Sequence, residues 1–242
     1  MRELMYHIKE TRNPPVVKPL KMTCDDKLHP SIPHPLPNRG GARFLIVGAP
    51  GSGKTNWAVS QLIKGGAYHR VFDSLHVVMP LNSRASFDKD PFEGHNKNYS
   101  ELTPEVLNKI LADVKKTAAA GGNSCVFIDD CAYALKEKPI ERALRELFFN
   151  ARHKKACIFL VSQTLRSIPN KVRLAASHVL AFEPANGLEA NVLASEFICL
   201  DPKSAGALFA QCFNNKHDHL LIHTAERKVY SNWNEVEIPR SF

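Results

Sequence analysis

The sequence predicts an α/β fold with a mostly parallel central sheet flanked by helices. Apolar runs of strand length recur along the chain, at residues 43–49, 74–80, 124–130, 156–163 and 178–184. Each run is continuously apolar instead of alternating, as expected of strands that are covered on both faces. Segments with helical periodicity separate the runs, which is the order of β-α-β units.

The helical segments carry their own start and stop signals. A helix expected over residues 55–66 stops at a pair of glycines. A second, expected over residues 103–122, has Thr103 as its cap and Pro104 in its first turn, and it also stops at two glycines. A third helix is expected over residues 139–153.

The pattern changes after the fifth apolar run. Two short helices are expected over residues 186–198 and 201–213, and a C-terminal β-hairpin over residues 218–233. The polar stretch 81–102 is aperiodic and long for a plain connection, and such loops are usually functional or mobile.

Residues 48–55 match the pattern G-x-x-x-x-G-K-[ST] in full, between an apolar run and a helical segment. Glycines in such a loop let backbone N–H groups turn inward, and the helix that follows presents its positive dipole end to phosphates. Lys54 is expected to reach the β- and γ-phosphates, and the Thr55 hydroxyl to ligate Mg²⁺. The predicted nucleotide-binding residues are Gly48, Ala49, Pro50, Gly51, Ser52, Gly53, Lys54, Thr55 and Asn56.

A phosphate-binding loop needs a second group for Mg²⁺ and a group for the attacking water. Asp129, at the end of an apolar run, is predicted to hold Mg²⁺ through water, and Asp130 to act as general base or to orient the water. Gln163, after the next apolar run, is predicted to sense the γ-phosphate. The alternatives are a solvated strand end for the two acids and a strand-end cap for the amide.

A polar sensor on a separate strand is typical of the additional-strand class of P-loop NTPases, which are mostly motors. We therefore interpret residues 42–242 as one P-loop ATPase domain and residues 1–41 as a proline-rich N-terminal arm. The arm holds seven of the sixteen prolines and cannot sustain a helix or a central strand. It is either extended on the domain surface or on a neighbouring subunit, or it is a disordered leader.

Composition restricts the setting. Thirty-two Lys and Arg against 24 Asp and Glu give a net charge of +8, which suits nucleic acid or another anionic partner. The six cysteines form no CxxC pair, and the charged N-terminus lacks an apolar signal core. No apolar run approaches the roughly 20 residues of a spanning helix. We expect a soluble protein without a membrane span, in a reducing compartment.

The phosphate loop, the run ending in Asp129 and Asp130, and above all residues 150–182 resemble the poxvirus-type viral genome-packaging ATPases. These belong to the FtsK–HerA superfamily and occur in large DNA viruses and virophages. The specific part is Arg-His-Lys, an apolar strand, Ser-Gln, then Ile-Pro and a basic residue before the next strand. The similarity spans about residues 43–183, and residues 186–233 are compatible with it.

The resemblance implies a homo-oligomeric ring, expected to be a hexamer, that hydrolyses ATP with Mg²⁺ to drive double-stranded DNA into a preformed capsid. It implies capsid or portal partners, and a location in the host cytoplasm, in a viral factory or on the virion. It also implies that the sensor strand lies between the P-loop strand and the acidic strand. Superfamily members commonly carry Asp-Glu where this chain has Asp129 and Asp130, which leaves the identity of the base open.

Ring motors of this type usually insert an arginine from the adjacent subunit into the nucleotide site. Arg152, before the sensor strand, is the first candidate, and Arg142, Arg145 and Arg173 compete with it. Basic residues near strand ends, in 136–138, 152–155 and 166–173, are expected to face the nucleotide side and suit DNA contacts that do not read sequence.

His217, His219 and His223 would share one face if their segment is a strand, where an ordinary edge strand is a better interpretation than a zinc site.

Two other functions stay open. A P-loop kinase of a small molecule or nucleoside would turn over ATP only with an acceptor, and residues 81–102 could serve as its lid. A nucleotide-gated capsid assembly protein would bind ATP with negligible turnover.

Overall fold

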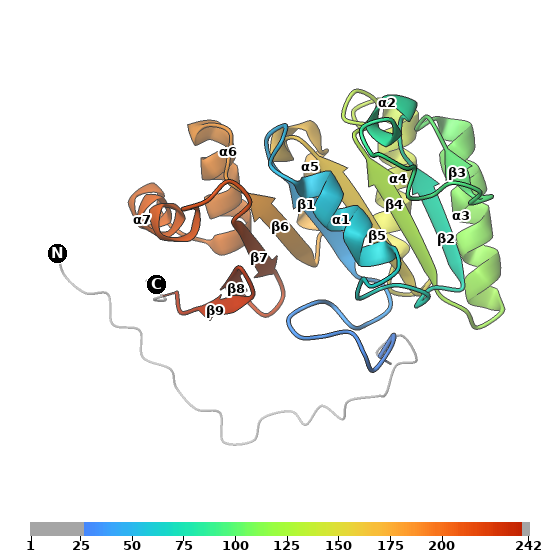
Figure 1. Ribbon diagram of the computed structural model, residues 1–242, viewed down its shortest axis with the longest axis horizontal. Helices are drawn as coiled ribbons and strands as arrows, with labels where there is room; N and C mark the ends of the chain where they lie inside the picture. Colours follow the sequence, from blue (N-terminus) through green and yellow to red (C-terminus); the bar gives the residue numbers. More distant parts are fainter. Residues whose placement is uncertain (1–26, 239–242) are drawn as a thin grey trace, which may run out of the picture.

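A computed structural model describes residues 27–238 of the chain. A nine-stranded sheet, in the order β3-β2-β4-β5-β1-β6-β7-β8-β9, forms the centre of this part (Figure 1). The strands are β1 Arg43–Val47, β2 Ser74–Val78, β3 Asn98–Tyr99, β4 Ser124–Asp129, β5 Ala156–Ser162, β6 His178–Phe182, β7 His219–His223, β8 Lys228–Ser231 and β9 Asn234–Val236.

The first six strands of the sequence are parallel, and the last three add antiparallel to the β6 edge. All five predicted strands are present, and β1, β4, β5 and β6 have nearly continuous buried runs, as the absence of alternation predicted. The sensor strand β5 lies between β1 and β4, as the resemblance implied.

Helices connect the strands and cover the sheet. They are α1 Lys54–Leu62, α2 Leu81–Arg84, α3 Pro104–Ala119, α4 Lys138–Asn150, α5 Asn170–Leu174, α6 Gly187–Val192 and α7 Pro202–Cys212, with a 3-10 turn η2 Leu165–Ser167 and a π-helical turn η3 Leu193–Ile198. Helices α3, α4 and α7 contribute to one buried apolar layer, and α1 to the layer on the other face. Figure 1 shows α1 in front of the sheet and α4 behind it.

Three expectations needed adjustment. The C-terminal hairpin is present as β7 and β8, but β9 extends it to three strands. The stretch 81–102 is not structureless, because it contains α2 and the edge strand β3, which pairs with β2. The helix expected over residues 186–198 begins as α6, capped by the Asn186 side chain, and widens into the π-helical turn η3.

The described part of the proline-rich arm, residues 27–41, lies against the sheet domain; residues 1–26 fall outside the described residues. Ile32 and Leu36 are buried in the α1 layer. Tyr68 donates a hydrogen bond to the carbonyl of Pro37 at 2.8 Å. Between residues 27 and 238, no helix combines the length and apolar character required to cross a bilayer.

Candidate nucleotide site

The phosphate-binding loop lies at the carboxyl edge of the parallel strands, between the end of β1 at Val47 and the start of α1 at Lys54. Gly51 and Gly53 have φ angles of 76° and 98°, a region that L side chains rarely adopt. No side chain caps α1, so the N–H groups of its first turn are open to an anion. All nine predicted nucleotide-binding residues therefore belong to this loop or to the first turn of α1.

Asp129, the last residue of β4, is fully buried beside this helix. Its Oδ1 accepts a hydrogen bond from the Thr55 hydroxyl at 3.2 Å, and its Oδ2 has no partner. Burial raises the pKa of Asp129 to about 6, the charge of Asp130 adds to this, and Thr55 and Lys54 oppose it. A buried carboxylate with an unpartnered oxygen next to a hydroxyl fits a divalent cation, so these residues suit Mg²⁺.

Asp130 follows directly, with a left-handed φ of 51° that turns the chain out of the strand. Its Oδ1 accepts a hydrogen bond from Gln163 Nε2 at 3.1 Å. Its Oδ2 lies 3.4 Å from the hydroxyl of Ser83 on α2. The structure thus brings both predicted catalytic groups of the strand ends together and adds Ser83, whose segment the sequence marked only as a long connection.

Strand order explains this convergence. In the pairing of β4 with β5, Asp129 lies opposite Val161, and in the pairing of β5 with β1, Ser162 lies opposite Val47. The carboxyl ends of three adjacent strands therefore meet at one edge, with a carboxylate pair, an amide and a phosphate loop on successive strands.

Arg152 and the other basic residues of 152–155 lie at the opposite edge of the sheet and not on the predicted nucleotide side, because they directly precede the amino end of β5. Arg152 is exposed in the turn between α4 and β5, and its backbone packs against Gly41, just before β1. Burial lowers the pKa of Arg43, the first residue of β1, and the charge of Arg152 lowers it further. The phosphate loop follows the other end of this strand, roughly 16 Å away at 3.3 Å per residue. Arg152 cannot serve its own nucleotide site, so a finger role would act on a neighbouring subunit.

Arg173 is bound within its own chain. Its guanidinium forms a two-pronged ion pair with Glu196, at 2.8 Å and 2.7 Å, and donates to the carbonyls of Leu165 and Ile168. This arrangement disfavours Arg173 as a finger, because it would first have to break these contacts. Arg142 and Arg145 lie on α4 and stay alternatives.

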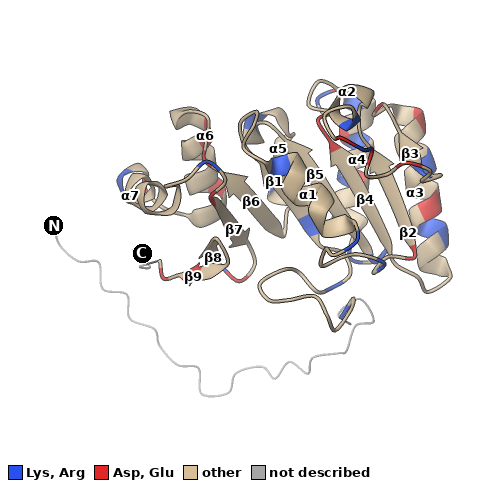
Figure 2. Ribbon diagram, viewed as in Figure 1, with Lys and Arg blue, Asp and Glu red and all other residues tan. Residues whose placement is uncertain are grey.

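Within residues 27–238, the basic residues do not gather in one stripe. Figure 2 shows Lys and Arg spread over several helices and loops, with acidic residues among them on α3. The distribution is compatible with scattered phosphate contacts and does not by itself delimit a nucleic-acid surface.

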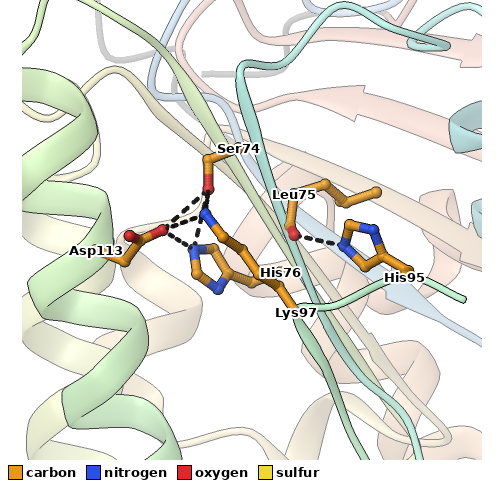
Figure 3. Close-up of polar contacts among 6 residues, drawn as sticks. All are labelled: Ser74, Leu75, His76, His95, Lys97 and Asp113. Carbon is orange, nitrogen blue, oxygen red and sulfur yellow. Dashed lines mark hydrogen bonds and ion pairs between the residues drawn. The ribbon is translucent and has the colours of Figure 1, made fainter.

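A second polar cluster lies at the β2 edge and involves a buried histidine (Figure 3). His76 Nε2 is 2.9 Å from Asp113 Oδ2 and 3.2 Å from the Ser74 hydroxyl, and Lys97 Nζ is 2.6 Å from the same carboxylate oxygen. Burial, assisted by Lys97, lowers the pKa of His76 to about 4, so the contact with Asp113 is a hydrogen bond from a neutral ring at pH 7.

The cluster is not a nucleophilic triad. A triad places the acid and the hydroxyl on opposite ring nitrogens, whereas here both meet Nε2, and Nδ1 is buried with no partner. The network instead ties the end of the 81–102 segment, through Lys97, to α3 and β2. His95, whose ring contacts the carbonyl of Leu75 at 2.7 Å, adds a second tie.

Of the three histidines near the C-terminus, His219 and His223 share one face of β7, as expected of residues four apart in a strand. However, β7 lies between β6 and β8 and is not the predicted edge strand. His219 and His223 lie at the two ends of β7, but His217 precedes the strand and contacts the phosphate loop. Among residues 27–238, no group of three or more His, Cys, Asp or Glu could hold a metal ion.

Residues 42–220 match the family model described as zonular occludens toxin (Zot). The chain belongs to the Zot family. Protein 015R of Frog virus 3 (isolate Goorha), which is uncharacterized, is 24% identical over 207 residues, which are 81% of this chain and 60% of that relative. The chain thus spans somewhat more than half the length of the viral relative that it matches.

Solved structures share the fold. The DNA-packaging ATPase B204 of Sulfolobus turreted icosahedral virus has a TM-score of 0.62 and 16% identity, over 82% of this chain and 98% of B204. The genome packaging NTPase B204 of Sulfolobus turreted icosahedral virus 2, in complex with ATP-gammaS, has a TM-score of 0.57 and 15% identity, with the same coverage of both chains. The pCW3 conjugation coupling protein TcpA, with ATPgS, has a TM-score of 0.52 and 12% identity, over 81% of this chain and 59% of TcpA.

These matches confirm the predicted P-loop NTPase fold and, at the level of the fold, the resemblance to viral genome-packaging ATPases. The assignment to the FtsK–HerA superfamily stays a prediction.

Proposed function

We propose that this protein is an ATP-hydrolysing motor that moves double-stranded DNA into a preformed viral capsid. The observation that carries the proposal is the convergence of Lys54, Thr55 and Asp129 with the Asp130–Gln163 pair at one edge of the sheet. A binding protein needs only the phosphate loop, whereas hydrolysis also needs a group for the attacking water, and we assign that task to Asp130. The fold shared with a viral DNA-packaging ATPase and a conjugation coupling protein supports DNA as the cargo.

Each residue has a distinct role in this proposal. Lys54 and the N–H groups of the first α1 turn bind the β- and γ-phosphates. Asp130 orients or deprotonates the attacking water, and Gln163 holds the Asp130 carboxylate in place. Mg²⁺, held by Thr55 and through water by Asp129, would neutralise charge on the phosphate oxygens.

The assembly completes the proposal. The protein would work as a ring of identical subunits, a hexamer, next to capsid or portal proteins in the host cytoplasm, in a viral factory or on the virion. The viral origin of the 24% identical relative supports this setting. Contacts with DNA would be made by Lys and Arg with phosphates, so DNA binding should weaken steeply with salt.

ATP hydrolysis by the purified protein, measured with and without duplex DNA, tests the proposal. We expect hydrolysis that requires Mg²⁺, rises with duplex DNA of any sequence and is lost in Lys54→Ala. A nucleoside kinase would transfer phosphate only to an added acceptor and ignore DNA. Binding of ATP without turnover would instead indicate a nucleotide-gated assembly protein.

A further inference from the structure

His217 is the one histidine of the C-terminal group that contacts the phosphate-binding loop. Its Nδ1 lies 2.9 Å from the carbonyl oxygen of Ser52. The same ring lies over Gly53, where a Cβ would stand 3.1 Å from Nδ1. The contact joins residues 165 positions apart, from the loop between α7 and β7 to the loop between β1 and α1.

The chemistry of this contact fixes its direction. A carbonyl oxygen can only accept, so the hydrogen must be on Nδ1 and the imidazole must donate. In a trans peptide the C=O and the next N–H point in opposite directions. Holding the Ser52 carbonyl outward, on the side of His217, therefore directs the Gly53 N–H to the other side of the loop. Gly53, whose φ is 98°, has no side chain to hold that peptide in place.

The loop that carries His217 is itself fastened. Asp218 Oδ2 accepts hydrogen bonds from the backbone N–H groups of Asn214 and Asn215, at 2.9 Å and 2.7 Å. Asp218 Oδ1 accepts from the side chain of Asn232, in the turn between β8 and β9, at 2.8 Å. These bonds fix the position of the imidazole before any ligand arrives, which is the condition for a positioning role.

The next residue of that turn reaches the helix behind the phosphate loop. The Trp233 ring stacks on Trp57 of α1, with 6.0 Å between the ring centroids, and meets His219 edge-on at 5.0 Å. The C-terminal segment thus contacts the nucleotide site twice, through His217 at the phosphate-binding loop and through Trp233 at the helix that follows this loop.

We propose that His217 is a positioning residue for the phosphate-binding loop: it holds the Ser52–Gly53 peptide in the orientation that binds a nucleotide triphosphate. The proposal rests on the nucleotide site described above and not on DNA translocation. The α7–β7 loop would thus orient the Ser52–Gly53 peptide, which neither the residues 48–55 themselves nor the strand β4 with Asp129 can do.

A matched pair of variants tests it. His217→Asn keeps an N–H donor near the position of Nδ1, whereas His217→Leu has a side chain of similar size and no donor. We expect Asn to bind Mg-ATPγS within about 2-fold of wild type and Leu to bind about 3- to 10-fold more weakly, because one hydrogen bond is at stake. Calorimetry measures the binding. The emission of Trp57 and Trp233, the two tryptophans of the chain, provides a second signal.

Two measurements separate positioning from simple support of the fold. The unliganded unfolding temperatures of the Asn and Leu variants should be alike, and in ATP hydrolysis KM should rise for Leu with kcat nearly unchanged. Lys203→Leu, an exposed change on α7, should bind ATPγS as wild type does.

Equal affinities of the Asn and Leu variants would overturn the proposal. Wild-type protein that binds ATPγS without hydrolysing ATP would contradict the proposed motor and leave the comparison of variants valid. Wild-type protein that does not bind ATPγS would contradict the nucleotide site on which both rest.

Discussion

The Nε2 atom of Gln163 lies 3.1 Å from Oδ1 of Asp130, so the amide of one strand end holds the carboxylate of the next. The two residues are 33 positions apart and meet because β5 lies beside β4 in the sheet. A movement of the Gln163 amide, for example on contact with a γ-phosphate, would therefore alter the hydrogen bond that orients the Asp130 carboxylate. This coupling makes the pair the best place to separate nucleotide binding from hydrolysis.

Asp130→Asn should lower kcat by about 10²- to 10⁴-fold, the usual contribution of a general base, and leave ATP binding nearly unchanged. The isosteric Gln163→Glu should also lower kcat, because it replaces the donor by a second carboxylate. Single-turnover hydrolysis together with ATPγS affinity measures both effects. An Asp130→Asn enzyme with wild-type kcat would remove Asp130 from the catalytic role.

Asp129→Asn should stabilise the unliganded protein at pH 7.5. Because the folded pKa of Asp129 is raised from 3.8 to about 6, the folded state holds the extra proton between these values, and stability falls as pH rises through that window. The variant escapes this cost, which is at most about 3 kcal/mol at 1.36 kcal/mol per pKa unit. Urea unfolding at pH 7.5 and pH 4 measures the difference, which should shrink at pH 4.

Mg-ATP provides the matching control for Asp129. The ligand should raise the unfolding temperature of wild type more than that of Asp129→Asn, because the variant lacks the carboxylate that we propose holds the cation. If Asp129→Asn without ligand is less stable than wild type at pH 7.5, the prediction that the buried Asp129 carboxylate destabilises the unliganded protein is wrong.

The His76 cluster should make stability fall in mild acid. The pKa of His76 is lowered from 6.5 to about 4, so stability is complete above pH 6.5 and is lost as pH falls toward 4. His76→Gln should flatten this part of the curve of unfolding free energy against pH. The pKa values of His178 and His223 are lowered too, so the difference between variant and wild type is the quantity that matters. Parallel curves would contradict the assignment to His76.

Arg173→Met should cost about 2–3 kcal/mol of stability, since it leaves Glu196 without its two-pronged partner in a largely buried position. The double variant Arg173→Met with Glu196→Gln should recover part of that loss. Urea unfolding measures both, and the folded variant should retain hydrolysis. Loss of hydrolysis with unchanged stability would instead restore Arg173 as a finger candidate.

Arg152 should act only between subunits. Arg152→Ala and Lys54→Ala should each be inactive alone, and mixing them should restore some hydrolysis, because a Lys54→Ala subunit can lend its Arg152 to an intact site next to it. A finger contributes about 10³- to 10⁵-fold in rate, so partial restoration is easily measured. Mixtures that stay inactive leave Arg142 and Arg145 to be tested in the same way.

The sequence alone determined the parts that depend on local pattern. Continuous apolar runs predicted buried parallel strands, and the match at residues 48–55 predicted the phosphate loop, because both follow from short-range geometry. The positions of Asp129 and Gln163 at strand ends also came from the sequence, since polar residues directly follow apolar runs there.

Only the tertiary structure decided which distant residues meet. Strand order, and with it the Asp130–Gln163 contact, depends on how the whole sheet packs. The local sequence pattern leaves this order open, and only the family resemblance implied it. The same packing places Ser83 beside Asp130, and it places Arg152 beside Gly41, at the edge of the sheet opposite the phosphate loop. The His217–Ser52 bond spans 165 positions, and no local periodicity carries information over such a separation, because side-chain contacts there are set by the assembled sheet.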